Sequence, residues 1–255
     1  MLQSNTRSKK KQMQLTNKTI VITGGTAGIG RQLVQLLAPA NHLYVIGRSV
    51  AKLNDLQQKY PNVIAIHADL NDTTLLETKL AQLLKQVSKV DVLINNAAVQ
   101  HTATYIDPNF QYQQIASEIN VNFTAICQLT YLLLPTLMAS ESARIVNINS
   151  GLAIAPKAQS AIYCASKSAL NSFSLSLRYQ LEHTSVLVQQ ALLPLVDTAM
   201  TEGRGSGKLV AREAAQHIIR GIERGTLDND IGKVKLLRLL MRFAPNMAYK
   251  LMKAS

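Results

Sequence analysis

The sequence contains few of the residues that build disulfide-linked or metal-binding proteins. Two cysteines, Cys127 and Cys164, are too few for a disulfide framework in a chain of 255 residues. The five histidines form no closely spaced cluster, so we expect no metal site. The scarcity of cysteine favours a reducing, cytoplasmic location.

Long apolar segments are also missing. The first residues, MLQSNTRSKKKQMQ, are polar and basic, and they lack the apolar stretch of a secretory signal. The longest apolar runs are interrupted by charge or proline before they reach membrane-spanning length. We therefore expect no signal peptide and no transmembrane helix.

Acidic residues are absent from one end of the chain and scarce at the other. The net charge is +12: residues 1–18 carry five basic and no acidic side chains, residues 19–203 carry eleven of each sign, and residues 204–255 carry eleven basic and four acidic ones. A neutral main body argues against a broad nucleic-acid surface, so we expect no nucleic-acid partner. The two basic ends remain as candidate contacts for an anionic partner.

Short apolar strands alternate with amphipathic helices along most of the chain. We expect strands at residues 18–25, 42–47, 63–70, 91–98, 144–150 and 185–194, and helices at 29–38, 73–87, 110–138 and 163–181. This alternation predicts right-handed βαβ units around a parallel sheet. With 47% hydrophobic residues the chain can form one large core. We therefore expect an α/β, Rossmann-type doubly wound fold with a mostly parallel seven-stranded sheet and helices on both faces.

Composition divides the chain into three segments. Residues 1–17 are polar and basic without apolar periodicity, which predicts disorder. We expect residues 18–232 to form a single Rossmann-type domain, and residues 233–255 to form a basic amphipathic helix that Pro245 should bend or end. This last helix has two interpretations: it lies on an anionic membrane surface at the inner face of the membrane, or it packs on the body or across a dimer interface. We favour the packed helix.

A glycine-rich run, TGGTAGIG, follows the first expected strand and opens the first expected helix. Gly24, Gly28 and Gly30 let backbone N–H groups approach a pyrophosphate, which the positive end of the helix stabilises. A tight turn without a ligand is the alternative, and we favour phosphate binding. The second strand ends at Arg48 and Ser49, where an NAD site usually carries an acidic residue. A guanidinium matches a 2′-phosphate, so we expect NADP(H) rather than NAD(H).

A tyrosine and a lysine lie four residues apart in the run YCASK, downstream of a lone serine. Tyr163 and Lys167 share one face of the expected helix, and Ser150 ends the strand before it. Together with TGGTAGIG, Asp69, the run NNAA at 95–98 and Asn122, these residues resemble the short-chain dehydrogenase/reductase superfamily over residues 18 to about 232. The sequence departs from the family in having NNAA for the usual NNAG, and Pro194-Leu195 for the usual Pro-Gly.

The resemblance implies a role for each of these side chains. Tyr163 is the acid/base, Lys167 lowers its pKa and binds the nicotinamide ribose, Ser150 orients the substrate oxygen, and Asn122 helps to hold a water in a proton relay. The expected cofactor contacts, from the glycine loop and the resemblance together, are Gly24, Thr26, Gly28, Ile29, Gly30, Arg48, Ser49, Asp69, Leu70, Asn95, Ala97, Tyr163, Lys167 and Thr198. The substrate is then a small-molecule carbonyl or alcohol, and we expect a homo-oligomer.

Longer phrases narrow the resemblance further. NNAAVQ, NINSGLA, PLVDTAM and IGKVKLLRLLMRFAPNMAYKLM look like the DltE-like oxidoreductases, a likeness that implies no particular substrate. The glycine-rich segment 197–210 is either a surface loop or a mobile substrate lid. We expect His101 on an exposed loop rather than in the substrate pocket, and Cys164 as a packed residue rather than a nucleophile. Two alternatives to an active enzyme remain: a catalytically silent nucleotide-binding scaffold, and a peripheral membrane protein that acts through its C-terminal helix.

Overall fold

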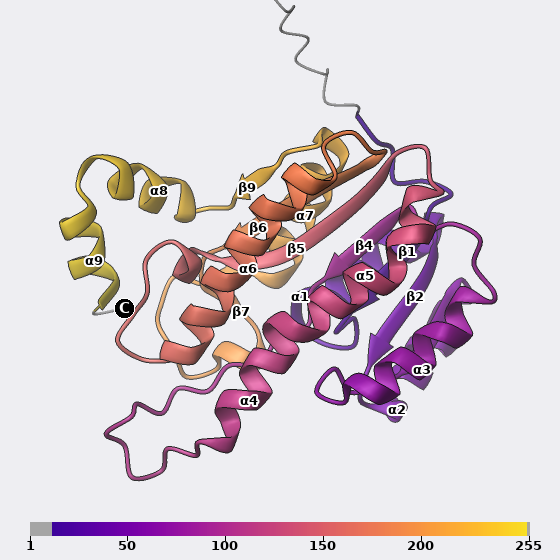
Figure 1. Ribbon diagram of the computed structural model, residues 1–255. Helices are drawn as coiled ribbons and strands as arrows, with labels where there is room; N and C mark the ends of the chain where they lie inside the picture. Colours follow the sequence, from indigo (N-terminus) through magenta and orange to yellow (C-terminus); the bar gives the residue numbers. More distant parts are fainter. Residues whose placement is uncertain (1–11, 254–255) are drawn as a thin grey trace, which may run out of the picture.

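A parallel sheet of seven strands forms the centre of the computed structural model, which describes residues 12–253 (Figure 1). In sheet order the strands are β3 (Val63–His67), β2 (His42–Gly47), β1 (Thr19–Thr23), β4 (Val92–Asn95), β5 (Ala143–Ser150), β6 (Val186–Leu193) and β9 (Asp228–Asp230). Every neighbouring pair is parallel. The order turns back between β1 and β4, which makes this a doubly wound sheet with its switch point beside β1. The predicted fold class is confirmed.

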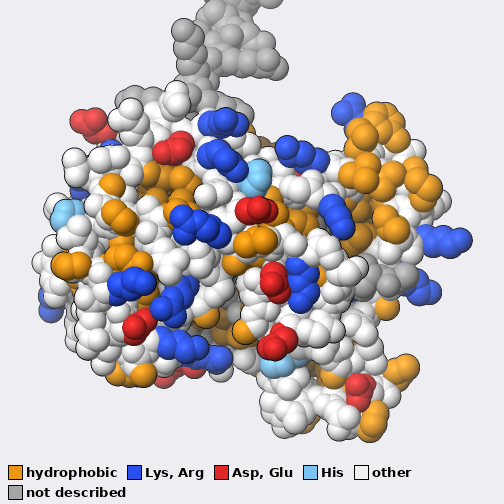
Figure 2. All heavy atoms as spheres, turned by 180° about the vertical axis from the view of Figure 1, so that it is seen from behind, with side chains coloured by type: hydrophobic (Ala, Val, Ile, Leu, Met, Phe, Trp, Pro, Cys, Tyr) orange, Lys and Arg blue, Asp and Glu red, His pale blue; other side chains and the backbone are white. Residues whose placement is uncertain are grey.

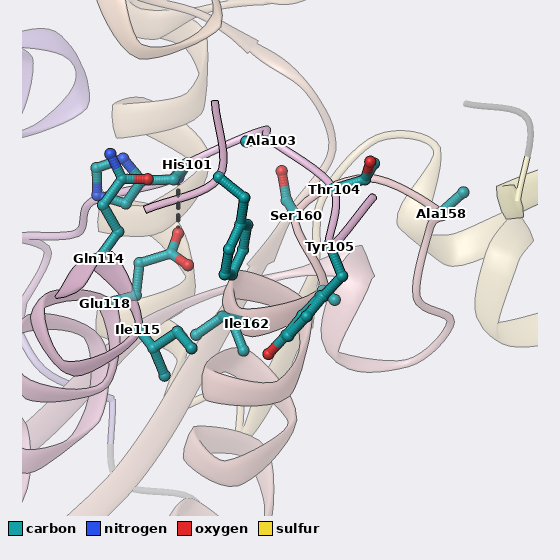
Figure 3. A pocket seen from close by; sticks show the side chains of 12 residues that line it. His101, Ala103, Thr104, Tyr105, Gln114, Ile115, Glu118, Ala158, Ser160 and Ile162 are labelled. Carbon is teal, nitrogen blue, oxygen red and sulfur yellow. Dashed lines mark hydrogen bonds between the residues drawn. The ribbon is translucent and has the colours of Figure 1, made fainter. Parts of the chain in front are cut away.

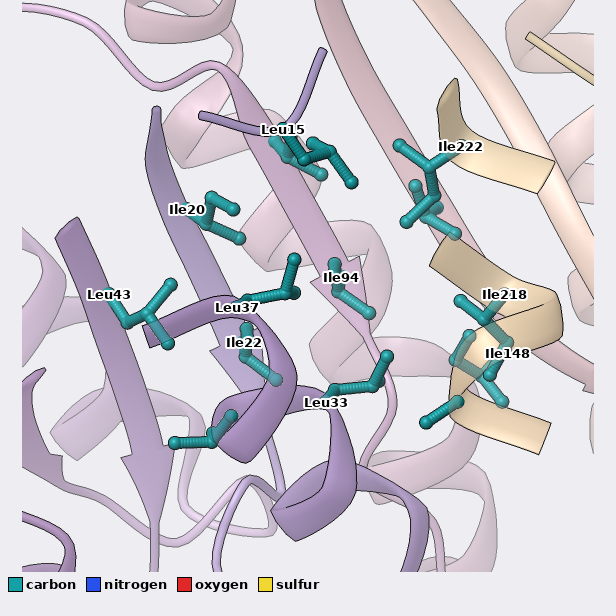
Figure 4. Close-up of a cluster of buried hydrophobic side chains, with 14 of the residues drawn as sticks. Leu15, Ile20, Ile22, Leu33, Leu37, Leu43, Ile94, Ile148, Ile218 and Ile222 are labelled. Atoms are coloured by element: carbon teal, nitrogen blue, oxygen red, sulfur yellow. The ribbon is translucent and has the colours of Figure 1, made fainter. Parts of the chain in front are cut away.

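Helices cover both faces of the sheet because its strands are apolar on both sides. On one face Ile20 and Ile22 of β1 pack against α1 (Gly28–Leu37), α2 (Val50–Lys59) and α7 (Ala211–Arg224), as Figure 4 shows for part of this cluster. On the other face, Val21 packs with α3 (Thr73–Leu84), α5 (Ala125–Met138) and α6 (Ala161–Gln180). Successive residues of a strand point to opposite faces, so one strand serves both layers.

One helical stretch is long and apolar enough to cross a membrane, by length and composition alone. It spans Gln113–Met138 and joins α4 (Gln113–Ile119), the π-helical turn η2 (Asn120–Thr124) and α5. The sequence analysis expected no stretch of that length, because charge and proline interrupt it. Ala125, Leu129 and Leu133 are fully buried against the sheet, which accounts for the apolar composition of α5.

The N-terminal boundary of the folded chain lies earlier than predicted. Met13 and Leu15 are buried in the core, and the Met13 N–H donates to the Glu223 carbonyl over 2.9 Å. The side chain of Asn41 donates to the carbonyl of Leu15 over 3.0 Å. The prediction of disorder through residue 17 is therefore wrong for residues 13–15, whose two apolar side chains fill a gap beside α7. The rest of that prediction, on residues 1–11, lies outside the described residues.

The C-terminal segment, expected as one helix that Pro245 bends or ends, forms two helices that meet at this proline. α8 (Val234–Phe243) ends before Ala244, and Pro245 is the first residue of α9 (Pro245–Lys253). Proline removes a backbone donor and fits the start of a helix, which explains the break. Leu237 and Ala248 are buried with Ala155, so the inner side of this pair packs on the body.

Candidate active site

The predicted site residues gather at the carboxyl ends of β1, β4 and β5, beside the switch point. The glycine loop follows β1 and opens α1, where Gly24 and Gly28 have positive φ angles of 67° and 50°. The start of α1 has no side-chain cap and no acidic residue in its first turn. Its backbone N–H groups can therefore receive an anion such as a phosphate.

Gly30, the last glycine of the loop, lies so close to neighbouring atoms that no residue with a side chain would fit there. A Cβ at Gly30 would lie 2.1 Å from the Gly24 carbonyl oxygen and 2.5 Å from Nδ2 of Asn96. A Cβ at Gly24 would lie 2.9 Å from Cα of Ala97. The loop is thus pressed against the turn after β4, as a narrow pyrophosphate cradle requires.

Asn96 locks this arrangement, although the sequence analysis did not assign it a role. Its Nδ2 donates to the carbonyls of Thr23 and Gly24 over 3.0 and 3.2 Å. In return, Oγ1 of Thr23 accepts from the N–H groups of Asn96 and Ala97, each over 3.0 Å. In the sequence, the two consecutive asparagines at positions 95 and 96 were the feature from which this role of Asn96 could have been predicted.

The residues expected near the adenosine half end two neighbouring strands. Arg48 follows β2 with an exposed side chain, and its carbonyl lies 3.2 Å from Nε2 of His67 at the end of β3. Oγ of Ser49 accepts from the N–H of Lys52 over 3.5 Å, so this serine caps α2. Asp69 closes a turn by accepting from the Asn71 N–H over 2.9 Å. Arg48 and Asp69 therefore lie at the same sheet edge as the glycine loop. The Ser49 hydroxyl oxygen already accepts a hydrogen bond at the start of α2.

Asn95 belongs to a buried chain of amides beneath the site. Its Nδ2 donates to Oδ1 of Asn147 over 2.8 Å, and Nδ2 of Asn147 donates to Oγ of Ser174 over 2.8 Å. The Oδ1 atom of Asn95 is buried without a protein partner. An orphaned acceptor at this depth suits a ligand or a water that donates a hydrogen bond to it.

Lys167 is a buried cation aimed at the end of β5. Its side chain is 2% exposed, and Nζ donates to the carbonyl of Ile148 over 3.0 Å. Nζ also lies 5.6 Å from the ring centroid of Tyr163, as the spacing of four residues on α6 predicted. Burial lowers the pKa of Lys167 to about 8, so the ammonium form still dominates at pH 7.

The phenol of Tyr163 does not have the lowered pKa that the sequence analysis expected. Burial raises the pKa of Tyr163, Cys164 and Glu118 raise it further, and Arg204 lowers it. The prediction that neighbouring protein groups lower the pKa of Tyr163 is therefore wrong. Removal of the phenol from water raises this pKa by more than nearby cations lower it. At neutral pH the phenol keeps its proton.

Asn122 lies in the π-helical turn η2, a distortion frequent at functional sites. Oδ1 accepts from the Val99 N–H over 2.9 Å, while Nδ2 donates to the Val99 carbonyl over 2.9 Å and to Oγ of Ser166 over 3.2 Å. Oγ of Ser166 in turn donates to the Tyr163 carbonyl over 2.8 Å. The side-chain amide of Asn122 thus joins the loop after β4 to the helix that carries Tyr163, and both its ends are engaged.

Ser150 and Thr198 lie at or after the ends of two other strands, β5 and β6, near the same edge of the sheet. Ser150 is the last residue of β5, and its Oγ accepts from the Leu152 N–H over 3.1 Å, which leaves the hydroxyl proton free to be donated. Thr198 caps a short 3₁₀ turn, and its Cγ2 would lie 3.1 Å from a Cβ on Gly28. Thr198 therefore lies next to the glycine loop.

The glycine-rich segment 197–210 extends toward the site and is anchored there. Nη1 of Arg204 donates to Oε1 of Gln100 over 2.9 Å, and Nζ of Lys208 donates to the Thr201 carbonyl over 2.7 Å. The Arg204 guanidinium lowers the pKa of Tyr163, against the larger effect of burial. The location suits either of the two interpretations, surface loop or lid.

A pocket of about 50 Å³ opens between the loop after β4, α4 and the start of α6. Glu118 is buried on its wall, and one carboxylate oxygen accepts from the His101 N–H over 2.7 Å (Figure 3). Burial raises the pKa of Glu118, partly offset by that bond. Ser160 is buried with a left-handed backbone, φ 58°, and its Oγ has no protein partner. His101 lines this pocket, so the prediction of an exposed loop histidine is wrong.

Cys164, the residue after Tyr163, is buried, and burial raises the pKa of its thiol. A thiol kept protonated is a poor nucleophile. The prediction of a packed residue is confirmed. Glu118 and Ser160, in contrast, were missed, because their burial depends on a loop folding over them from a distant part of the chain.

Comparison with known proteins identifies the class. The profile of the short chain dehydrogenase family matches residues 18–208. The chain therefore belongs to that family, and it is an oxidoreductase with a nucleotide-binding fold.

Individual relatives agree with this assignment. The uncharacterized oxidoreductase DltE of Bacillus subtilis is 36% identical over 233 residues, covering 89% of this chain and 92% of that protein. The ketoacyl reductase HetN of Nostoc is 30% identical over 227 residues, 84% of this chain and 78% of its own. The expected resemblance to DltE-like oxidoreductases is confirmed.

Solved structures show the same fold at low sequence identity. A short chain dehydrogenase from Burkholderia cenocepacia in complex with NADP has a TM-score of 0.84 at 21% identity, covering 94% of this chain and 99% of its own. One from Burkholderia phymatum in complex with NAD has a TM-score of 0.82 at 20% identity, covering 94% and 97%.

Proposed function

We propose that this oxidoreductase transfers hydride between NADP(H) and the carbonyl or alcohol carbon of a small molecule. The observation that carries the proposal is the buried ammonium of Lys167, which bonds the end of β5 next to Ser150 and faces the ring of Tyr163. Burying a cation is costly, so its retention at this crevice favours a chemical role.

Each residue has a separate role in the proton transfer that accompanies reduction of a carbonyl. Ser150 donates a hydrogen bond to the substrate oxygen and stabilises the negative charge that develops there. Tyr163, protonated at neutral pH, gives its phenolic proton to that oxygen, which becomes the hydroxyl of the product. Lys167 stabilises the phenolate that remains until a proton returns from solvent. Asn122 fixes the segment that carries Tyr163, through Ser166.

A dinucleotide fits the protein groups at this edge. The glycine loop and the start of α1 would hold the pyrophosphate, Arg48 would bind the 2′-phosphate of NADP(H), and Asp69 and Leu70 would contact the adenine. Lys167 would bind the nicotinamide ribose, and Thr198 the carboxamide. When bound, the nicotinamide supplies or accepts the hydride at the reacting carbon.

The experiment is a screen of aldehydes, ketones and alcohols, in which the absorbance of the reduced nicotinamide is followed with NADPH and with NADH. For any accepted substrate, we expect Tyr163→Phe to lower kcat by about 10²- to 10⁴-fold while calorimetry shows unchanged nucleotide binding. Tyr179→Phe, on the exposed side of the same helix, is the matched control. Undiminished turnover by Tyr163→Phe would refute the acid/base role, and failure to bind either nucleotide would refute the whole proposal.

A further inference from the structure

α8 is apolar on two sides, and the body uses only one of them. Val234 and Leu237 face inward and are buried. Leu236, Leu239 and Phe243 face outward, with 59%, 55% and 72% of their surface exposed. Their spacing of three and four residues aligns them in one stripe along the helix. A helix that keeps a second apolar stripe beyond its packing face presents a surface for a further contact.

α9 extends this apolar surface past the break at Ala244. Met247 and Leu251, one turn apart, are 58% and 61% exposed. Figure 2 shows the projecting C-terminal part of the chain as a group of hydrophobic side chains bordered by lysine and arginine. We call the outer stripe of α8 and these two exposed residues of α9 together the outer face.

The charges around the outer face all have one sign. Lys235, Arg242, Lys250 and Lys253 are exposed around it, and residues 231–253 contain no acidic side chain. Arg238 is different, because it is held by the carboxylate of Asp230. The pattern of an apolar stripe with flanking cations is that of helices that lie in a membrane interface.

A cationic pocket of about 380 Å³ lies next to the same helix. It is lined by Arg220, Arg224, Lys235 and His217, together with Asp230, which Arg238 already binds. Burial, then Arg220 and Lys235, lower the pKa of His217, so the neutral imidazole adds no charge of its own. The basic field therefore extends from the outer face onto the end of α7, which suits an anionic headgroup.

We propose that the outer face docks on an anionic membrane surface. Leu236, Leu239 and Phe243 enter the interface, while Lys235 and Arg242 contact acidic headgroups. A nucleic acid would leave the apolar stripe unused. A second copy of this chain would bring identical cations together across a two-fold axis, without acidic partners on this face. Charge complementarity thus favours the membrane.

The test is co-sedimentation of the full chain with vesicles, comparing phosphatidylglycerol–phosphatidylcholine mixtures with pure phosphatidylcholine at two salt concentrations. We expect binding to the anionic vesicles that weakens with salt. Leu236→Gln/Leu239→Gln/Phe243→Gln should lower the partition coefficient by at least about tenfold. Tyr131→Gln/Tyr179→Gln, at two exposed aromatic residues on α5 and α6, should leave it unchanged.

A second pair of variants separates the cations of this face from exposed cations elsewhere on the body. Lys235→Gln/Arg242→Gln should weaken binding by about fivefold per cation removed, whereas Lys59→Gln/Lys85→Gln, which removes the same charge from α2 and the residue after α3, should have no effect. Equal losses in both variants, or vesicle binding that survives loss of the stripe, would overturn the proposal. So would a concentration-dependent dimer that the stripe variant abolishes, since the outer face would then be a contact between copies.

Discussion

Replacing Lys167 by methionine should make the protein more stable at neutral pH, and the gain should vanish in alkali. Burial lowers the pKa of Lys167 from its ordinary 10.5 to about 8. Each unit of pKa corresponds to about 1.4 kcal/mol, so keeping this cation buried costs about 3 kcal/mol at pH 7. Lys167→Met removes that cost and loses the hydrogen bond to the Ile148 carbonyl, worth about 1 kcal/mol. We expect a net gain of about 2 kcal/mol.

The pH dependence isolates the charge from the lost hydrogen bond. Below pH 8 the lysine is protonated in both the folded and the unfolded chain. Between about pH 8 and 10.5 only the unfolded chain binds the proton, so the stability of the wild type rises with pH. The advantage of Lys167→Met over the wild type should therefore shrink by about 2–3 kcal/mol from pH 7 to pH 10.

Urea unfolding followed by circular dichroism at both pH values measures this difference. Lys59→Met, at an exposed position on α2, is the control and should show a difference that does not change with pH. A difference between Lys167→Met and the wild type that stays constant within about 1 kcal/mol would refute the reasoning, because Lys167 would then not be a buried cation.

Three further predictions concern the cofactor site and the core. Arg48→Ala should weaken NADPH relative to NADH by about 10- to 100-fold in calorimetry, since a charge-assisted contact to the 2′-phosphate is lost; equal weakening of both nucleotides contradicts the selector role. Gly30→Ala should abolish nucleotide binding and destabilise the fold, because the new Cβ would collide with the Gly24 carbonyl; normal binding by titration contradicts the cradle. Leu15→Ala should lower the free energy of unfolding by about 2–4 kcal/mol in urea, because the buried leucine leaves a cavity; an unchanged urea midpoint contradicts the packing of this residue in the core.

Six of the seven sheet strands could be predicted because each is a short apolar run. β9 could not, since its sequence, Asp-Asn-Asp, carries no apolar signal. It is held by pairing with β6 and by Arg178, which bonds both carboxylate oxygens of Asp228. That contact joins residues fifty apart, and local pattern does not report it.

The two helices that were overlooked differ in how visible they were. α7 has apolar residues at helical spacing, with Ala214, Ile218 and Ile222 buried, so its pattern was available in the sequence. α2 buries only Leu53 and Leu56 in an otherwise polar stretch, which is a weak signal. The strongest clue to its start, Ser49 as the capping residue, was assigned to the cofactor.

The catalytic candidates could be assigned from the sequence because their spacing on α6 and their place after β5 are local features. The pKa of Tyr163 could not, because it depends on how much water the surrounding loops exclude. Glu118 and Ser160 were hidden for the same reason. A buried carboxyl group looks like any other helical glutamate until the chain around residues 101–110 folds over it.

The inner side of α8 packs against the turn that follows Ser150, a residue of the proposed catalytic centre. A Cβ at Gly151, the residue after Ser150, would lie 3.3 Å from both Leu237 and Val234, so these two side chains brace the turn that aims the serine hydroxyl. Removing or tilting α8 would let that turn relax. A truncation that removes α8, about eighty residues after Ser150 in the sequence, would therefore lower activity as a mutation in the proposed active site would. A lipid or protein that binds α8 from outside and shifts it would therefore also shift the Ser150 hydroxyl, which we propose binds the substrate oxygen.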